Sequence, residues 1–209
     1  MAEALPPGVT HWDGPPLSAW KPWPPYELMK RVAGAQIPWA ICGGWAIDLF
    51  LGEETRAHED IEIEILRADF AKLRDWLRPL EFYAVGDGQV RALAPGALPP
   101  EDKHQTWLCD PGPNIWLMDA MLQEGDAQTW VCRRNPALTA PRDRMIAKTR
   151  YGVPYLKPEA VLLFKAKQTR PKDEADFANA APRMDKAARA WLKDALTQTH
   201  PEHRWIAQL

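Results

Sequence analysis

Residues 39–65 read WAICGGWAIDLFLGEETRAHEDIEIEI, and their pattern predicts several consecutive structural elements. It opens with a short apolar run that ends at the pair Gly43-Gly44, and apolar residues then recur at helical spacing up to Gly52. Its last six residues, DIEIEI, alternate acid and isoleucine, which is the period of a β-strand. Strand, glycine turn, helix and strand together predict an α/β fold.

The acids of the closing strand, Asp60, Glu62 and Glu64, are predicted to share one strand face. Neighbouring carboxylates on such a face lie about 7 Å apart and repel one another. Mg²⁺ would offset this repulsion, because it prefers carboxylate and phosphate oxygens, and two such ions about 3.5–4 Å apart can clamp a phosphoryl group. The simpler alternative is a strand face that is only solvated.

The pair Gly43-Gly44 favours a Mg²⁺ site over a strand face that is only solvated. It lies between a strand and a helix, where backbone N–H groups and the helix N-terminus can receive phosphate oxygens. A plain connection between strand and helix explains the glycines equally well when they are taken alone. The combination of a glycine pair, a helix and an Asp-x-Glu strand is more specific than any of its parts.

A further acid, Asp119, interrupts the apolar run 115–122. Burying an unpaired carboxylate there would be costly, and metal coordination would remove that cost. An edge position that faces solvent is the alternative. Asp119 is therefore a candidate partner for the acids of the first strand.

Four segments carry a family resemblance, namely residues 43–49, 55–63, 116–122 and 155–177. They resemble the active-site stretches of the aminoglycoside 2''-adenylyltransferase and lincosamide nucleotidyltransferase group, within the DNA polymerase β-like nucleotidyltransferase superfamily. The resemblance covers about residues 26–180. Two differences stand out: Gly43-Gly44 replaces the Gly-Ser of the wider superfamily, and Asp60-x-Glu62 replaces the Asp-x-Asp of the drug-modifying members.

The resemblance implies a mixed β-sheet flanked by helices, followed by a helical C-terminal subdomain. It implies that Asp60 and Glu62 bind metal and that Asp119 completes the catalytic site, as a metal ligand or as the base for the acceptor hydroxyl. Contacts with the nucleotide are expected at Gly43, Gly44, Arg56, His58 and Lys165. The alternatives are solvated loop side chains for Arg56 and His58 and a surface lysine for Lys165, while Lys172, Asp173 and Asp176 are expected to form structural ion pairs.

Three segments divide the expected architecture. Residues 1–25 alternate prolines with tryptophans, so we expect an extended arm that packs onto the body through its indoles. The nucleotidyltransferase domain is expected over 26–135. From residue 158 onward the apolar spacing is helical, and 136–209 are expected to form a mainly helical subdomain.

Composition limits the class of protein. The chain has 209 residues, 46% hydrophobic and 26% charged, with a formal net charge of -2, as in ordinary globular proteins. This balance of basic and acidic residues argues against a nucleic-acid partner. Interruption of the longest apolar run argues against a membrane span, and the N-terminus lacks a secretion signal, so we expect a cytoplasmic protein. The three cysteines are expected to be buried thiols.

Together these observations predict transfer of a nucleoside monophosphate, AMP from ATP, to a hydroxyl of a small acceptor such as an aminoglycoside-like antibiotic, with two Mg²⁺ ions as cofactors. Two alternatives stay open: a toxin-like enzyme that modifies protein or tRNA, and a nucleotide-binding module without turnover. Acids beyond the metal ligands predict a positively charged acceptor. They are Glu59, Glu64, Glu124 and Asp126.

Overall fold

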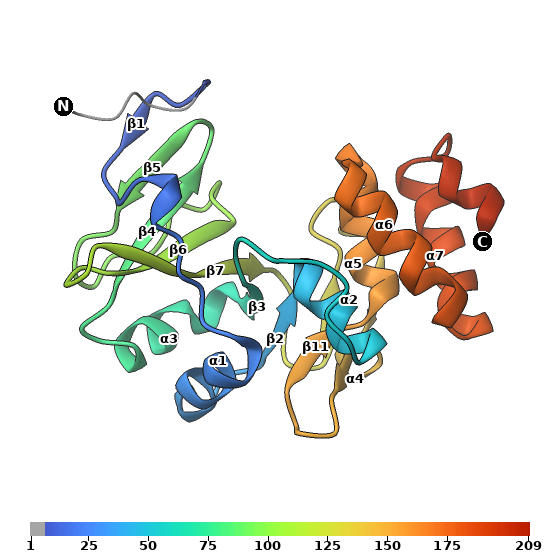
Figure 1. The fold of residues 1–209 in the computed structure, drawn as a ribbon, viewed down its shortest axis with the longest axis horizontal. Coiled ribbons are helices and arrows are strands. Elements are labelled where there is room, and N and C mark those ends of the chain that lie inside the picture. Colours follow the sequence, from blue (N-terminus) through green and yellow to red (C-terminus); the bar gives the residue numbers. More distant parts are fainter. Residues whose placement is uncertain (1–6) are drawn as a thin grey trace. The chain divides into compact units, whose positions relative to one another are not determined.

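The computed structural model describes residues 7–209, which form two compact units (Figure 1). Unit 1 comprises the described residues up to 39 together with 58–123. Unit 2 comprises 40–57 together with 124–209. The chain therefore passes through unit 2 for the glycine turn and its helix before it returns to unit 1. These units divide the chain differently from the expected segments 26–135 and 136–209, and that expected division stays a prediction.

Unit 1 is built on a mixed sheet with the strand order β1-β5-β4-β6-β7-β3. Its strands are β1 (His11–Trp12), β3 (Glu62–Leu66), β4 (Glu81–Gly86), β5 (Gln89–Ala92), β6 (Gln105–Asp110) and β7 (Ile115–Gln123). β3 runs parallel to β7, and β1 runs parallel to β5. β4 is antiparallel to β5 and β6, and β6 is antiparallel to β7. The mixed sheet expected from the sequence is confirmed.

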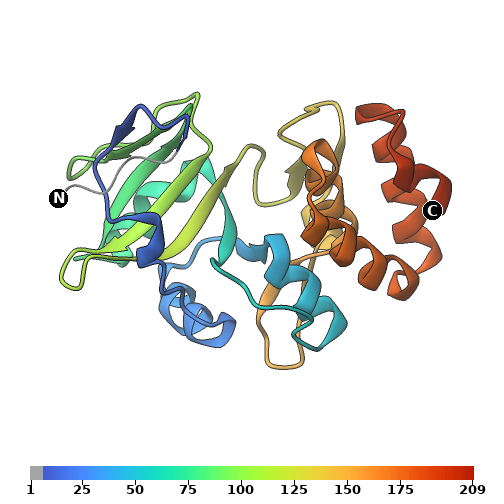
Figure 2. The ribbon, with the colours of Figure 1, turned by 45° about the horizontal axis from the view of Figure 1, so that its top comes forward.

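Helices and the N-terminal segment cover opposite faces of this sheet (Figure 2). The helical elements of unit 1 are η1 (Leu17–Ala19), α1 (Pro25–Val32), η2 (Ala33–Ala35), η3 (Arg67–Asp69) and α3 (Phe70–Trp76). In α3, Phe70 contacts Phe82 of β4, with ring centroids 5.1 Å apart. The next residue of β4, Tyr83, contacts Trp116 at 5.0 Å instead. Successive strand residues face opposite sides, so these two contacts lie on different faces of the sheet.

Strand β3 is covered more completely than its alternating sequence predicts. Ile61, Ile63 and Ile65 are fully buried, as expected for the apolar face. Glu64 is also 0% exposed, so the alternative of a strand face that is only solvated is wrong for this residue. Alternation specifies the period of a strand, but it does not specify whether both faces are covered.

The N-terminal arm packs onto the sheet, as its tryptophans predict. β1 pairs with β5, and Trp12 and Trp20 pack against a buried cluster that includes Trp116 and Tyr83. The indole of Trp116 donates a hydrogen bond of 3.0 Å to the carbonyl of Pro15. Aromatic burial thus holds a proline-rich segment that has little regular structure. The first six residues of the predicted arm lie outside the described residues.

A register shift between β6 and β7 positions the strand face that carries Asp119. Trp107 pairs with Asp119, but Cys109 pairs with Trp116, because the register shifts between Leu108 and Cys109. Trp116 and Asp119 are three residues apart and would face opposite sides of a regular strand. The shift places them on the same face, beside Trp107.

Unit 2 combines short strands with helices. β2 (Trp39–Cys42), most of which belongs to this unit, is parallel to β11 (Pro154–Leu156), and β11 is antiparallel to β10 (Ile146–Lys148). β8 (Thr129–Val131) pairs with β9 (Thr139–Pro141) in a separate sheet. The β-like run near residue 130 therefore forms a strand that lies outside the main sheet. The sequence shows that such a run favours a strand, but not which strand it pairs with.

The helical elements of unit 2 are α2 (Gly43–Leu51), α4 (Arg142–Met145), α5 (Pro158–Lys165), η4 (Ala166–Gln168), α6 (Pro171–Ala180), η5 (Ala181–Arg183), α7 (Lys186–Thr199) and η6 (Arg204–Gln208). α5 contacts α2, α6 and α7, so it is the central helix of this unit. Its residues from Pro158 to Leu163 are all buried. The three cysteines are buried free thiols, as expected. Within residues 7–209, every helix is too short or too polar to cross a membrane.

Candidate active site

Two of the three predicted catalytic acids are neighbours on adjacent parallel strands of unit 1. Glu62 of β3 pairs with Asp119 of β7, and the Asp119 backbone N–H donates to the Ile61 carbonyl at 2.9 Å. Asp60 lies two residues before the start of β3 and is exposed, whereas Glu62 is half-buried. The third acid, Asp119, is only 2% exposed. Strand pairing thus joins two distant parts of the sequence, as the candidate site requires.

The carboxylate of Asp119 is bonded on one side only. Its Oδ2 accepts hydrogen bonds from the Gln105 amide and, at 3.2 Å, from the indole N–H of Trp107. Its Oδ1 is buried and has no hydrogen-bond partner among residues 7–209. Burial raises the pKa of Asp119 well above its usual value, and the charges of Glu62 and Asp60 raise it further, against the lowering effect of the two hydrogen bonds.

The buried, unpaired oxygen fits a carboxylate that binds a cation. A buried oxygen without a partner carries an unfavourable free energy, which a metal ion or a proton would remove. Within the described residues, no group of three or more His, Cys, Asp and Glu side chains is arranged to hold a metal ion. Neighbouring carboxylates repel one another without a cation, so we expect the side chains of Asp60 and Glu62 to adjust when a cation binds. The three residues as metal ligands stay a prediction.

The predicted glycine turn lies at the start of α2 in unit 2. Gly43 has φ = 62°, in the left-handed region that favours glycine, and Gly44 continues the first turn. Both residues are half-buried. The backbone conformation at position 43 therefore favours glycine, because a side chain there would strain the backbone. The backbone N–H groups at the start of a helix remain suitable for phosphate oxygens.

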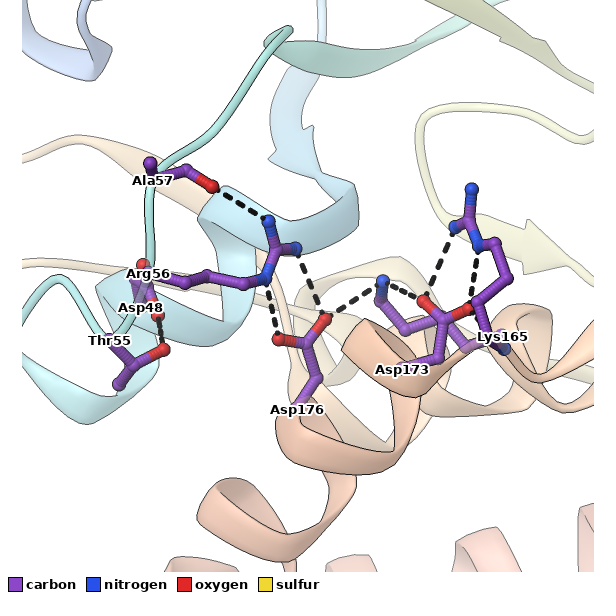
Figure 3. A network of polar contacts seen from close by, with 8 residues as sticks. Asp48, Thr55, Arg56, Ala57, Lys165, Asp173 and Asp176 are labelled. Atoms are coloured by element: carbon purple, nitrogen blue, oxygen red, sulfur yellow. Dashed lines mark hydrogen bonds and ion pairs between the residues drawn. The ribbon is translucent and has the colours of Figure 1, made fainter.

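Arg56 and Lys165 belong to one ion-pair network of unit 2 (Figure 3). Arg56 donates from Nε and Nη2 to the two oxygens of Asp176, at 3.1 and 3.3 Å. The Lys165 ammonium lies between Asp173 and Asp176, at 2.7 and 2.9 Å. Both carboxylates are 1% exposed. Asp173 also accepts hydrogen bonds from Arg170.

This network bears on the simpler alternatives for Arg56 and Lys165, which were a solvated loop side chain and a surface lysine. Lys165 has a side chain only 9% exposed, so it is not a surface lysine. Asp173 and Asp176 do form ion pairs, as expected. Both pair with Lys165 of α5, Asp176 also pairs with Arg56 of the loop after α2, and Asp173 also pairs with Arg170 at the start of α6. Whether Arg56 and Lys165 also contact a nucleotide stays a prediction.

The structure therefore divides the predicted site residues between its units. Unit 1 carries His58, which is half-buried, together with Asp60, Glu62 and Asp119. Unit 2 carries Gly43, Gly44, Arg56 and Lys165.

Sequence reasoning missed Gln105 and Trp107, the two donors to Asp119. They are two residues apart on β6, so they share a strand face, and Trp107 pairs directly with Asp119. Side chains with a hydrogen-bond donor at alternate positions of a strand were the available signal. That signal has no meaning until the partner strand and its register are known.

Comparison with known proteins agrees with this architecture. Residues 26–91 match the family model described as aminoglycoside-2''-adenylyltransferase. No functionally curated protein matches the chain. The matched residues contain the glycine turn, Asp60 and Glu62, whereas Asp119 and Lys165 lie beyond them.

Solved structures share the fold at low sequence identity. The lincosamide antibiotic adenylyltransferase LnuA, solved with lincomycin bound, has a TM-score of 0.54 and 18% identity, and the alignment covers 76% of this chain and 95% of that one. ANT(2'')-Ia in complex with adenylyl-2''-tobramycin has a TM-score of 0.51 and 17% identity over 82% and 96%. A solution structure of ANT(2'')-Ia gives 0.52 and 18% over 83% and 91%.

Identity this low establishes the fold alone. The family match is independent of it and covers the segment in which the glycine turn is followed by the Asp-x-Glu strand. The chain therefore shares the fold of these adenylyltransferase structures, and its residues 26–91 resemble the aminoglycoside-2''-adenylyltransferase family.

Proposed function

We propose that the chain transfers AMP from ATP to a hydroxyl of a small acceptor of the antibiotic class, with pyrophosphate as the second product. The observation that carries the proposal is the pairing of Glu62 with Asp119, whose buried Oδ1 has no hydrogen-bond partner within residues 7–209. One solved relative is an antibiotic adenylyltransferase with lincomycin bound, and another holds adenylyl-2''-tobramycin. Both support a small acceptor that bears a hydroxyl.

The reaction forms one P–O bond and breaks another. The acceptor oxygen attacks the α-phosphorus, the bond from that phosphorus to the pyrophosphate oxygen breaks, and the hydroxyl proton leaves for a base. Asp119 is either that base or a ligand of the metal. A raised pKa suits a carboxylate that has to accept a proton.

Asp60, Glu62 and Asp119 would hold two Mg²⁺ ions. When bound, these ions neutralise charge on the triphosphate and on the leaving pyrophosphate. The protein's own task is to hold acceptor and nucleotide in line, which supplies much of the rate enhancement in such reactions. Backbone N–H groups at Gly43 and Gly44, with Arg56, His58 and Lys165, are the proposed contacts of the nucleotide.

We expect a positively charged acceptor. Glu59 and Asp60 are exposed and adjacent, so the surface next to the proposed metal ligands carries negative charge. Glu64 is buried and drops out of this argument. A cytoplasmic location, as expected from the sequence, stays part of the proposal.

The test is pyrophosphate release from ATP and Mg²⁺ across a panel of aminoglycosides, lincosamides and neutral sugars. Release that depends on one acceptor, with adenylylated product in the mass spectrum, supports the proposal. Parallel calorimetry measures ATP binding with Mg²⁺ and with EDTA. Binding without release for every acceptor would indicate a nucleotide-binding module, and adenylylation of protein or tRNA would indicate the toxin-like alternative.

A further inference from the structure

The carboxylate of Asp119 is held asymmetrically, and this asymmetry is produced by two residues of the neighbouring strand. Gln105 and Trp107 both donate to Oδ2. Oδ1 receives no hydrogen bond from the residues that the structure describes. Two donors on one oxygen fix the plane of the carboxylate and leave the other oxygen as the available ligand or base.

The indole of Trp107 is itself fixed by aromatic neighbours. Trp12 and Trp20 of the N-terminal arm lie at centroid distances of 5.9 and 5.4 Å from it, in edge-to-face arrangements, and Trp116 lies at 5.2 Å. Edge-to-face contacts restrict the tilt of a ring as well as its position. The direction of the indole N–H, and therefore its hydrogen bond to Asp119, depends on this packing.

We propose that Gln105 and Trp107 are positioning residues of the transfer reaction, which orient Asp119 by holding its Oδ2, and that Trp12 and Trp20 support Trp107 in this role. The inference rests on the proposed function. Partners that orient a metal-binding carboxylate commonly change metal affinity or activity by about 10–100-fold when removed. The arm would then be a structural part of the catalytic site.

A purely structural role makes a different prediction. If Trp107 served only as a packed ring, its replacement by Phe would keep most of the aromatic packing and change mainly stability. If Gln105 were an ordinary strand residue, Gln105→Met would retain its length and remove only a polar contact. Neither change would then alter metal binding or turnover in the folded protein.

The experiment compares wild type with Trp107→Phe, Gln105→Met and the double variant, all in the full chain. Mn²⁺ binding is titrated in the presence of ATP by electron paramagnetic resonance, which counts free ions without needing turnover. Steady-state transfer gives kcat and KM for the acceptor. We expect each single change to weaken Mn²⁺ binding and lower kcat by about 10-fold, and the double change by more, with KM altered by less than about twofold.

The matched control is Trp205→Phe in unit 2. The indole of Trp205 also donates to a carboxylate, that of Glu174, at 3.1 Å, and its side chain is fully buried. The control removes the same kind of hydrogen bond, so it reports the effect of lost stability alone. It should leave Mn²⁺ binding and kcat unchanged.

A folded double variant with wild-type Mn²⁺ binding and wild-type kcat would overturn the inference. The proposed function fails in a different way, because wild type itself would then release no pyrophosphate with any acceptor. In that case the Mn²⁺ titration still tests the positioning role, since weaker binding in Trp107→Phe but not in Trp205→Phe would support it. Equal Mn²⁺ binding in all variants would reject it.

Discussion

Arg56 and Asp176 are 120 residues apart and form an ion pair, with 3.1 Å between Arg56 Nε and Asp176 Oδ1. The same carboxylate accepts from Lys165 at 2.9 Å, so one buried acid connects the loop after α2 with α5 and α6. The residue before Arg56 is held as well, because Thr55 donates to the buried Asp48 of α2 at 2.6 Å. Four residues after Arg56 the chain reaches Asp60, so this network anchors the segment that leads to the proposed metal ligands.

Asp176→Asn should destabilise the protein strongly. The amide would leave Arg56 and Lys165 with weaker partners in a largely buried place, and breaking a buried pair typically costs about 3–5 kcal/mol. Urea unfolding at pH 7 measures the change. Glu27→Gln is the control, because it breaks an exposed pair with Arg31 at 2.8 Å, and we expect a much smaller loss of stability. Equal losses in both variants would contradict a structural role for the network.

Asp173→Asn should change how stability depends on pH. Burial alone would raise the pKa of Asp173, but hydrogen bonds from Arg170 and Lys165 outweigh it and hold the pKa well below its usual value. The unfolded chain therefore binds the proton more readily, so this stabilisation is present above about pH 4 and is lost as pH falls further. The variant should be less stable than wild type at pH 7, with a difference that shrinks toward pH 2. Unfolding free energies measured from pH 7 to pH 2 check this, and a constant difference would contradict it.

Gly43→Ala should both strain α2 and weaken ATP binding. Gly43 has φ = 62° and Gly52, at the other end of the same helix, has φ = 81°. Alanine at either position should cost about 1–2 kcal/mol, because both glycines are in the left-handed region. Only Gly43 belongs to the proposed phosphate-binding turn. Calorimetry with ATP and Mg²⁺ should show weaker binding for Gly43→Ala than for Gly52→Ala, and equal affinities would remove the glycine turn from the site.

Local patterns in the sequence were sufficient to predict the central elements of the site. Turn chemistry and apolar spacing predict the strand, glycine turn and helix around Gly43, and alternation predicts β3, because each signal acts over a few residues. The burial of Glu64 was not predictable, since alternation does not say what covers the second face. The partner of Asp176 was not predictable either, because Arg56 reaches it only through the folded packing of a loop against α6.

The sequence could not show which oxygen of the Asp119 carboxylate is available for chemistry. Its donors, Gln105 and Trp107, lie on another strand, and the register shift between Leu108 and Cys109 decides which aromatic side chains share their face. A register shift depends on how two strands pair, and neither strand encodes it alone. Its place in an apolar run and the family resemblance both made Asp119 a candidate, while its environment could be seen only in the fold.

Asp119→Asn should abolish most transfer and leave the fold intact. The amide keeps the shape and can still accept a hydrogen bond from Trp107, but it loses the charge of a metal ligand and the basicity of a general base. Loss of a general base typically costs 10²–10⁴-fold, so we expect turnover to fall by at least about 100-fold.

In wild type without metal, burial and the nearby Glu62 raise the pKa of Asp119, so the folded protein retains a proton that the unfolded chain releases. Stability is therefore lost as pH rises above the unfolded value, and the variant escapes this loss. In EDTA its melting temperature should equal that of wild type near pH 4 and exceed it near pH 8. Turnover with an identified acceptor and melting at both pH values are the measurements, and a folded variant with near wild-type turnover would reject Asp119 as part of the catalytic site.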